Sequence, residues 1–147
     1  MHTKKKGRAG SRKVKGGSKW VEIGKDEIEK IIMDLHKSGM KPSSIGHILR
    51  DKHSVPDVRT VAGGKSVLQI IEGNTGKPEY PENLANLMKK AVTTRAHLGK
   101  HRSDVHNRIK LQSIESKIRR LGKYYARTGR LPANWAYDPA KAALLFK

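Results

Sequence analysis

The stretch NRIKLQSIESKIRRLGKYYART, residues 107–128, decides the fold. Its apolar residues step by three, four, three and four positions, the spacing of one helix face in a helix–helix seam; they are Leu111, Ile114, Ile118, Leu121 and Tyr125. Helical spacing also runs through residues 82–101, from Leu84 to Leu98, just after Pro81. The short connector near residues 102–106 makes the two helices antiparallel. We therefore predict an all-α protein whose C-terminal part is a helical bundle with a long antiparallel helical hairpin.

Residues 20–61 predict a smaller helical extension ahead of the hairpin. A first helix is marked by the apolar residues Ile28, Ile31, Ile32 and Leu35. Pro42 can occupy the first turn of a second helix, and a short third helix follows Pro56. Three short helices with tight turns resemble a helix-turn-helix unit, which often binds DNA. The third helix offers only Arg59 and Thr60 as groove readers, so we favour a packing or protein-docking module, with a helix-turn-helix DNA-binding regulator as the alternative.

Charge divides the chain into three parts. The 147 residues carry a formal net charge of +19, with 32 Lys and Arg against 13 Asp and Glu. Residues 1–19 hold eight of the basic residues and no acid, which predicts a disordered basic tail. Residues 20–61 hold seven basic and seven acidic residues, whereas residues 62–147 hold 17 basic and six acidic ones. We therefore expect residues 62–147 to form a domain that binds a polyanion, and the cell's common polyanions are nucleic acids and anionic membranes.

Several classes of protein are disfavoured by what the sequence lacks. It has no cysteine, which excludes disulfides and thiolate metal sites. No apolar run approaches the roughly 20 residues that span a bilayer, and the basic N-terminus lacks the apolar core of a secretory signal. The AGGK stretch at residues 62–65 has the wrong spacing for a phosphate-binding loop. We expect a protein of the cell interior that contacts no membrane, is not an enzyme and carries no cofactor.

A stripe of basic residues lies beside the apolar seam of the second hairpin helix. Its members step by three, four and three residues; they are Lys117, Arg120, Tyr124 and Arg127. Glu115 is the only acid in this helix. A solvated charged face usually carries both signs, whereas a face of one sign that includes an aromatic ring can hold phosphates and stack on sugars or bases. We interpret the stripe as a nucleic-acid contact.

The stretch HLGKHRSDVHNR, residues 97–108, concentrates histidines at the expected bend of the hairpin. His97, His101 and Asp104 are spaced by four and three residues, so they would share one face of a continuous helix. Histidines four apart can bind zinc with an aspartate as third ligand. The surrounding basic residues oppose a dication, however, and a thin hairpin lacks the pocket that acid–base catalysis needs. We expect neither a metal site nor catalysis here.

Two compatible interpretations of the bend remain. In the first, Asp104 or Asn107 caps the second helix and the histidines fill the bend. In the second, short hydrogen-bonding side chains among arginines, including Arg108, reach into the wide, shallow minor groove of A-form RNA, where 2′-hydroxyls and base edges are exposed.

Several motifs resemble one family in order and at compatible spacing. TGKPEYPENL (75–84), HLGKHRSDVHNR (97–108) and IESKIRRLGKYY (114–125) resemble the universal S-fifteen family of small-subunit ribosomal proteins. PSSIGHILRDKHSV (42–55) and LPANWAY (131–137) resemble its longer archaeal and eukaryotic form, called S-thirteen in older eukaryotic naming. The resemblance covers essentially residues 20–140, and the extension before the hairpin is what bacterial members lack.

The resemblance implies a structural constituent of the small ribosomal subunit in the cytoplasm. Such a protein binds the central domain of small-subunit ribosomal RNA (rRNA) and assists assembly, beside neighbouring ribosomal proteins and with a contact to the large subunit at an intersubunit bridge. By position, the residues that would contact a three-way RNA junction are Thr75, Gly76, Arg120, Tyr124 and Arg127. Those that would contact the minor groove of an adjacent stem are His97, His101, Asp104 and Asn107, where Asn107 replaces a serine of the bacterial family.

The C-terminal stretch YDPAKAALLF, residues 137–146, could form a short helix. Its last apolar residues, Leu144, Leu145 and Phe146, suggest burial either against the domain or against a neighbouring molecule.

Overall fold

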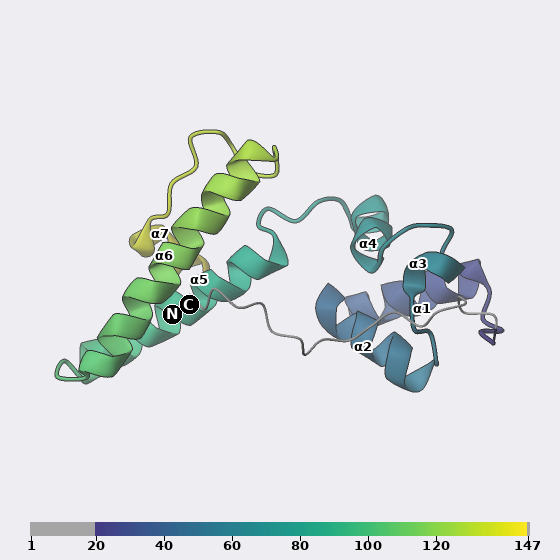
Figure 1. Ribbon diagram of the computed structural model, residues 1–147, viewed down its shortest axis with the longest axis horizontal. Helices are drawn as coiled ribbons and strands as arrows, with labels where there is room; N and C mark the ends of the chain where they lie inside the picture. The colour runs from purple at the N-terminus through teal and green to yellow at the C-terminus, as the bar shows by residue number, and fades with distance from the viewer. Residues whose placement is uncertain (1–19, 147) are drawn as a thin grey trace, which may run out of the picture. The chain divides into compact units, whose positions relative to one another are not determined.

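The computed structural model describes residues 20–146, all of whose regular elements are helices (Figure 1). They form two compact units that meet in the chain between Lys77 and Pro78. The all-α prediction is confirmed. The basic tail predicted for residues 1–19 lies outside the described residues.

The N-terminal unit contains four helices around one apolar core. They are α1 (Lys25–Lys37), α2 (Pro42–Lys52), α3 (Val58–Val61) and α4 (Val67–Thr75). Of the four apolar residues that marked the first helix, Ile28 and Ile32 are buried, while Ile31 and Leu35 pack half-buried against the same core. The short helix α3 begins after Asp57, whose carboxylate accepts a hydrogen bond from the Arg59 backbone N–H at 3.2 Å. The core consists of Ile28, Ile32, Ile45, Leu49, Val55, Ala62, Ile70 and Ile71.

The helix α4 was not predicted from the sequence. Its apolar residues form a nearly continuous run, so they show no helical period. A different signal marks its start: Ser66 accepts a hydrogen bond from the Gln69 backbone N–H at 3.3 Å, and the Ser66 N–H donates to the Gln69 side chain at 2.8 Å. This reciprocal pair is a capping box.

The position of α4 also moves the domain boundary. We expected a boundary between residues 61 and 62, where the charge changes, but α4 packs on α1 and α2 and supplies Ile70 and Ile71 to their core. The N-terminal unit therefore extends to Lys77. The charge of a segment shows where a polyanion can bind, and apolar burial decides where a compact unit ends.

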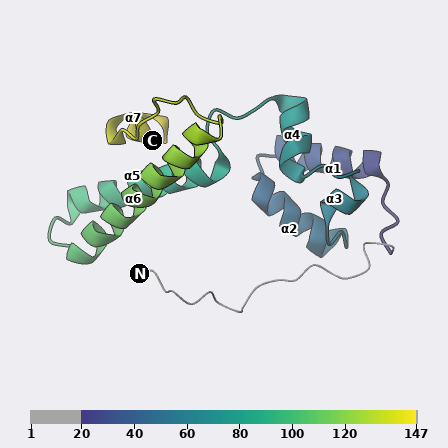
Figure 2. The same ribbon diagram turned by 45° about the horizontal axis from the view of Figure 1, so that its top comes forward.

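The C-terminal unit is built on the predicted hairpin. The helices α5 (Glu82–Lys100) and α6 (Val105–Arg127) lie antiparallel and side by side, joined by a short loop (Figures 1 and 2). Their seam buries Leu84 and Met88 from α5 against Ile114, Ile118 and Tyr125 from α6. The helix α6 begins two residues before the expected position 107, because Asp104 provides the cap.

After α6 the chain turns back along the hairpin. Gly129 has a φ of 71°, which favours glycine, and the Leu131 N–H donates to the Tyr125 carbonyl at 3.2 Å. The chain then reaches α7 (Pro139–Leu145), which packs on α5 and begins at Asp138, whose carboxylate accepts from the Ala140 N–H at 2.8 Å. Phe146 packs against the core of this unit, but Leu144 remains exposed, with 80% of its surface accessible.

Candidate nucleic-acid interface

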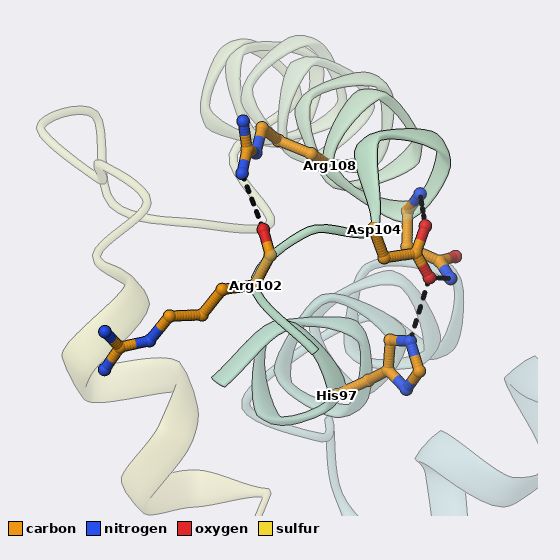
Figure 3. A network of polar contacts seen from close by, with 5 residues as sticks. His97, Arg102, Asp104 and Arg108 are labelled. Atoms are coloured by element: carbon orange, nitrogen blue, oxygen red, sulfur yellow. Dashed lines mark hydrogen bonds and ion pairs between the residues drawn. The ribbon is translucent and has the colours of Figure 1, made fainter. Parts of the chain in front are cut away.

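The hairpin bend is formed where α5 stops and α6 starts. The His101 N–H closes the last turn of α5 on the His97 carbonyl at 2.9 Å. Three residues later, Asp104 lies at the N-cap of α6, with its side chain turned toward the Asn107 backbone. The helix is therefore interrupted between His97 and Asp104, and the turn of the chain brings these two side chains together (Figure 3).

Asp104 is the centre of a network of polar contacts (Figure 3). Its Oδ1 accepts from the Asn107 backbone N–H at 2.9 Å, and its Oδ2 accepts from the Asn107 Nδ2 at 2.7 Å. The same Oδ2 lies 3.0 Å from the His97 Nε2. These contacts, with the two from Asn107 acting most strongly, hold the pKa of the Asp104 carboxyl well below its usual range.

The other predicted bend residues gather around this network. The rings of His97 and His101 lie 4.6 Å apart between centroids, at an interplanar angle of 33°. The Arg108 Nη2 donates to the Arg102 carbonyl at 2.7 Å, which ties the loop to the first turn of α6. His97, His101 and Arg108 are exposed to solvent. The bend thus presents preset polar groups outward, and both interpretations of it agree with this geometry.

Geometry disfavours a metal ion at the bend. Across residues 20–146, no group of three His, Asp or Glu side chains could hold one. Both oxygens of Asp104 already accept hydrogen bonds from Asn107.

The basic stripe lies on the solvent face of α6. Lys117, Arg120, Tyr124 and Arg127 are all exposed. The Tyr124 ring keeps 50% of its surface accessible and contacts the ring of Tyr125 edge-on, at 5.2 Å between centroids. The structure therefore places these four side chains along one accessible line, as their spacing predicted.

Glu115, the only acid in α6, does not neutralise the stripe. Its Oε1 pairs with Arg95 of α5 at 2.5 Å, and its Oε2 lies 3.6 Å from Arg119. Arg95 was missed by the sequence analysis, because a contact between residues 20 apart depends on the register of the two helices. The pair of Glu115 with Arg119, in contrast, can be predicted from the sequence, because the two residues stand at the i, i+4 spacing of a helical ion pair.

Thr75 and Gly76 end α4 in the N-terminal unit. The Thr75 hydroxyl donates to the Ile71 carbonyl at 2.8 Å, and Gly76 follows as the C-cap with a φ of 84°. Such a backbone conformation favours glycine because other residues are strained there. The bend and the stripe belong to the C-terminal unit, so the structure describes this turn separately from them.

Comparison with known proteins assigns the family. The family described as "Ribosomal protein S15" matches residues 67–145, and the one described as "Ribosomal S13/S15 N-terminal domain" matches residues 1–55. The chain belongs to the S15 family. It is 47% identical to the small ribosomal subunit protein uS15 of Methanoculleus marisnigri over 131 residues, which cover 89% of this chain and 86% of that protein.

Two further relatives carry the same name. The uS15 protein of Methanococcoides burtonii is 47% identical over 99% of this chain and 96% of its own length. That of Sulfolobus acidocaldarius is 45% identical over 88% of this chain and 84% of its own length. The predicted family and its long archaeal form are thus confirmed.

Membership of the S15 family fixes the broad role of the chain. It is a structural, non-enzymatic constituent of the small ribosomal subunit, associated with rRNA and with other ribosomal proteins, as predicted. In the part of the chain that the structure covers, no helix is long and apolar enough to cross a membrane.

Proposed function

We propose that this S15 protein binds a three-way junction in the central domain of small-subunit rRNA, together with the minor groove of an adjacent stem, and thereby assists assembly. The observation that carries the proposal is the pairing of two different surfaces on one rigid hairpin. One is the preset polar network at the bend, and the other is the basic stripe on α6.

The bend suits a minor groove because its side chains are short, polar and already oriented. Asn107 and His97 are held by Asp104, so little side-chain freedom is lost when RNA binds. The minor groove of A-form RNA is wide and shallow, and it displays 2′-hydroxyls and base edges that such groups can contact. His101 and Arg108 extend this surface on either side of the loop.

The stripe suits the phosphates of a junction. The guanidinium groups of Arg120 and Arg127 can each hold a phosphate with two hydrogen bonds, and Lys117 adds a point charge. The exposed ring of Tyr124 can stack on a sugar or base. The Thr75–Gly76 turn, which has no Cβ at Gly76, allows RNA backbone to approach the chain closely.

Binding of this kind performs no reaction. A protein that contacts one arrangement of the helices at a junction shifts the RNA population toward that arrangement. Residues 20–61, in which acidic and basic residues balance, suit neighbouring ribosomal proteins better than RNA. The contact with the large subunit at an intersubunit bridge belongs to the same proposal.

Binding measurements at several salt concentrations test the proposal. The purified chain is titrated with a small-subunit rRNA three-way junction, a scrambled RNA of equal length and a matched duplex DNA. We expect a preference for the junction that persists at high salt, because base-edge and shape contacts depend less on counterion release than phosphate contacts do. Equal binding to all three that collapses with salt would overturn the proposal, and equal affinity for the duplex DNA would instead favour a DNA-binding regulator.

A further inference from the structure

Arg95 occupies a position in the hairpin seam where the spacing calls for an apolar residue. The buried α5 residues step by four and three positions, through Leu84, Met88 and Ala91. The same steps continue to Arg95 and then to Leu98, so the Arg95 side chain leaves α5 on the side that faces α6. It nevertheless keeps 48% of its surface accessible. The seam therefore ends at Arg95 in a charged group that reaches solvent.

Glu115 of α6 binds Arg95 across this seam and binds a second arginine as well. Its Oε1 accepts a hydrogen bond from the Arg95 Nη2 at 2.5 Å, and its Oε2 lies 3.6 Å from the Arg119 Nη2. Only 13% of the Glu115 side chain is accessible, whereas 61% of the Arg119 side chain is. Because one carboxylate holds both guanidinium groups, Arg95 and Arg119 lie close together at the surface, with one positive charge in excess. We call them the arginine pair.

Stability alone does not explain these charges. Ion pairs near the surface contribute little to folding, and a partly buried pair can often be replaced by apolar residues without loss of stability. Leucine at positions 95 and 115 would simply extend the apolar seam between Ala91 and Leu98. The charges therefore favour a function at the surface of the hairpin.

The arginine pair is suited to bind a phosphate. A guanidinium group has five N–H donors, and Glu115 is the only hydrogen-bond or ion-pair partner of the two side chains within residues 20–146. Most of their donors are therefore available to an anion, and their planar forks match the oxygens of a phosphate. Lys123 follows one turn after Arg119 and is exposed, so the positive face continues along α6. Since the family associates with rRNA, we take the anion to be an RNA phosphate.

The arginine pair faces away from the basic stripe. Lys117 and Arg119 are two residues apart, which turns their side chains by about 200° around the helix axis. Arg119 and Tyr124 are five residues apart and differ by about 140°. An RNA strand that lies along Lys117 and Tyr124 thus cannot reach the arginine pair, which requires a second strand on another side of α6.

We propose that the arginine pair, held by Glu115, is a second phosphate-binding site, so that α6 lies between two strands of small-subunit rRNA. Glu115 does not touch the RNA and acts as a positioning residue for both arginines. This inference rests on the proposed function. It adds a third RNA contact on the C-terminal unit, besides the bend and the stripe.

Glu115→Gln tests the positioning role, because its effect on charge and its effect on geometry have opposite signs. Removing a negative charge raises the affinity of a protein for RNA in general. We nevertheless expect Glu115→Gln to lower affinity for a central-domain rRNA fragment about threefold, since an amide holds guanidinium groups less firmly than a carboxylate does. Glu79→Gln is the matched control, which removes an exposed acid of the same unit. It should bind the fragment at least as tightly as the wild type.

A second variant separates RNA binding from folding. Arg95→Leu and Glu115→Leu in one chain replace the ion pair by an apolar pair and keep the net charge at +19. We expect the thermal unfolding midpoint to be at least that of the wild type. Affinity for the same fragment at the same salt concentration should fall about tenfold, because one arginine is lost and the other is no longer held.

Either variant can overturn the inference. If Glu115→Gln tightens binding as Glu79→Gln does, Glu115 acts only through its charge. If the double leucine variant binds the fragment as tightly as the wild type, the ion pair serves the helix seam alone. Both outcomes are separate from the proposed function, which fails instead if the wild type does not prefer the three-way junction to scrambled RNA.

Discussion

The two ends of α6 bind their surroundings in different ways. At its first turn, Asp104 holds Asn107 and His97, and Arg108 holds the loop, so the polar groups are fixed before any ligand arrives. At its last three turns, by contrast, no hydrogen bond or ion pair within residues 20–146 holds the side chains of Lys117, Arg120 or Arg127. Fixed groups can discriminate between RNAs, whereas mobile cations add affinity that follows charge and salt. We therefore expect specificity from the bend and salt-dependent affinity from the stripe.

Removing Asp104, the centre of the bend network, should cause the largest loss of RNA affinity. We expect Asp104→Ala to lower affinity for the stem about tenfold to hundredfold and to change affinity for scrambled RNA little, by analogy with base-edge contacts. Titrations of both RNAs at one salt concentration measure this. Asp104→Asn is the control, because its amide oxygen still accepts from the Asn107 N–H and caps α6. An equal loss on both RNAs would contradict a role of the bend in specificity.

Removing the aromatic ring of the stripe should cause the next largest loss of RNA affinity. Tyr124→Ala removes a stacking surface of a kind typically associated with about 1–3 kcal/mol per base, so junction affinity should fall about tenfold. Tyr124→Phe keeps the ring and should change affinity less than about twofold, since stacking needs no hydroxyl. If Tyr124→Phe weakens binding as much as Tyr124→Ala, the hydroxyl makes a specific hydrogen bond and this part of the stripe resembles the bend.

A single lysine of the stripe should have a smaller effect of a different kind. Lys117→Ala should weaken all RNAs by a similar, few-fold factor and reduce the slope of log affinity against log salt by about one. The matched control is Lys52→Ala, which removes one exposed charge from the N-terminal unit. A slope that changes equally in both variants would show that net charge, and not the stripe, sets the salt dependence.

The sequence predicted the helices and their buried faces better than the contacts at the bend. The steps of three and four residues that selected Ile118 follow from helix geometry, and Ile118 is fully buried in the core of the C-terminal unit. The meeting of His97 with Asp104 depends on how the loop turns after the helix stops, and neither spacing nor composition specifies that turn. The contact of Arg95 with Glu115 likewise depends on the register of two helices.

The missed helix α4 has a related cause. A continuous apolar run is compatible with a buried helix or a strand, so periodicity could not identify it. The local signal at Ser66 and Gln69 was present in the sequence, and it shows that capping patterns carry information where the apolar pattern carries none.

The smallest expected effect concerns the stability of the free protein, and it tests the bend without RNA. Since the pKa of Asp104 is lowered on folding, its contacts stabilise the protein at pH values above the unfolded pKa of about 3.9, and this contribution is lost as the pH falls toward the folded pKa. The unfolding midpoint of the wild type should therefore exceed that of Asp104→Asn at pH 6, and the difference should shrink below pH ~4. A difference that stays constant down to pH ~2 would mean that the ionised carboxylate does not stabilise the bend, and its side chains would then be as free before binding as those of the stripe.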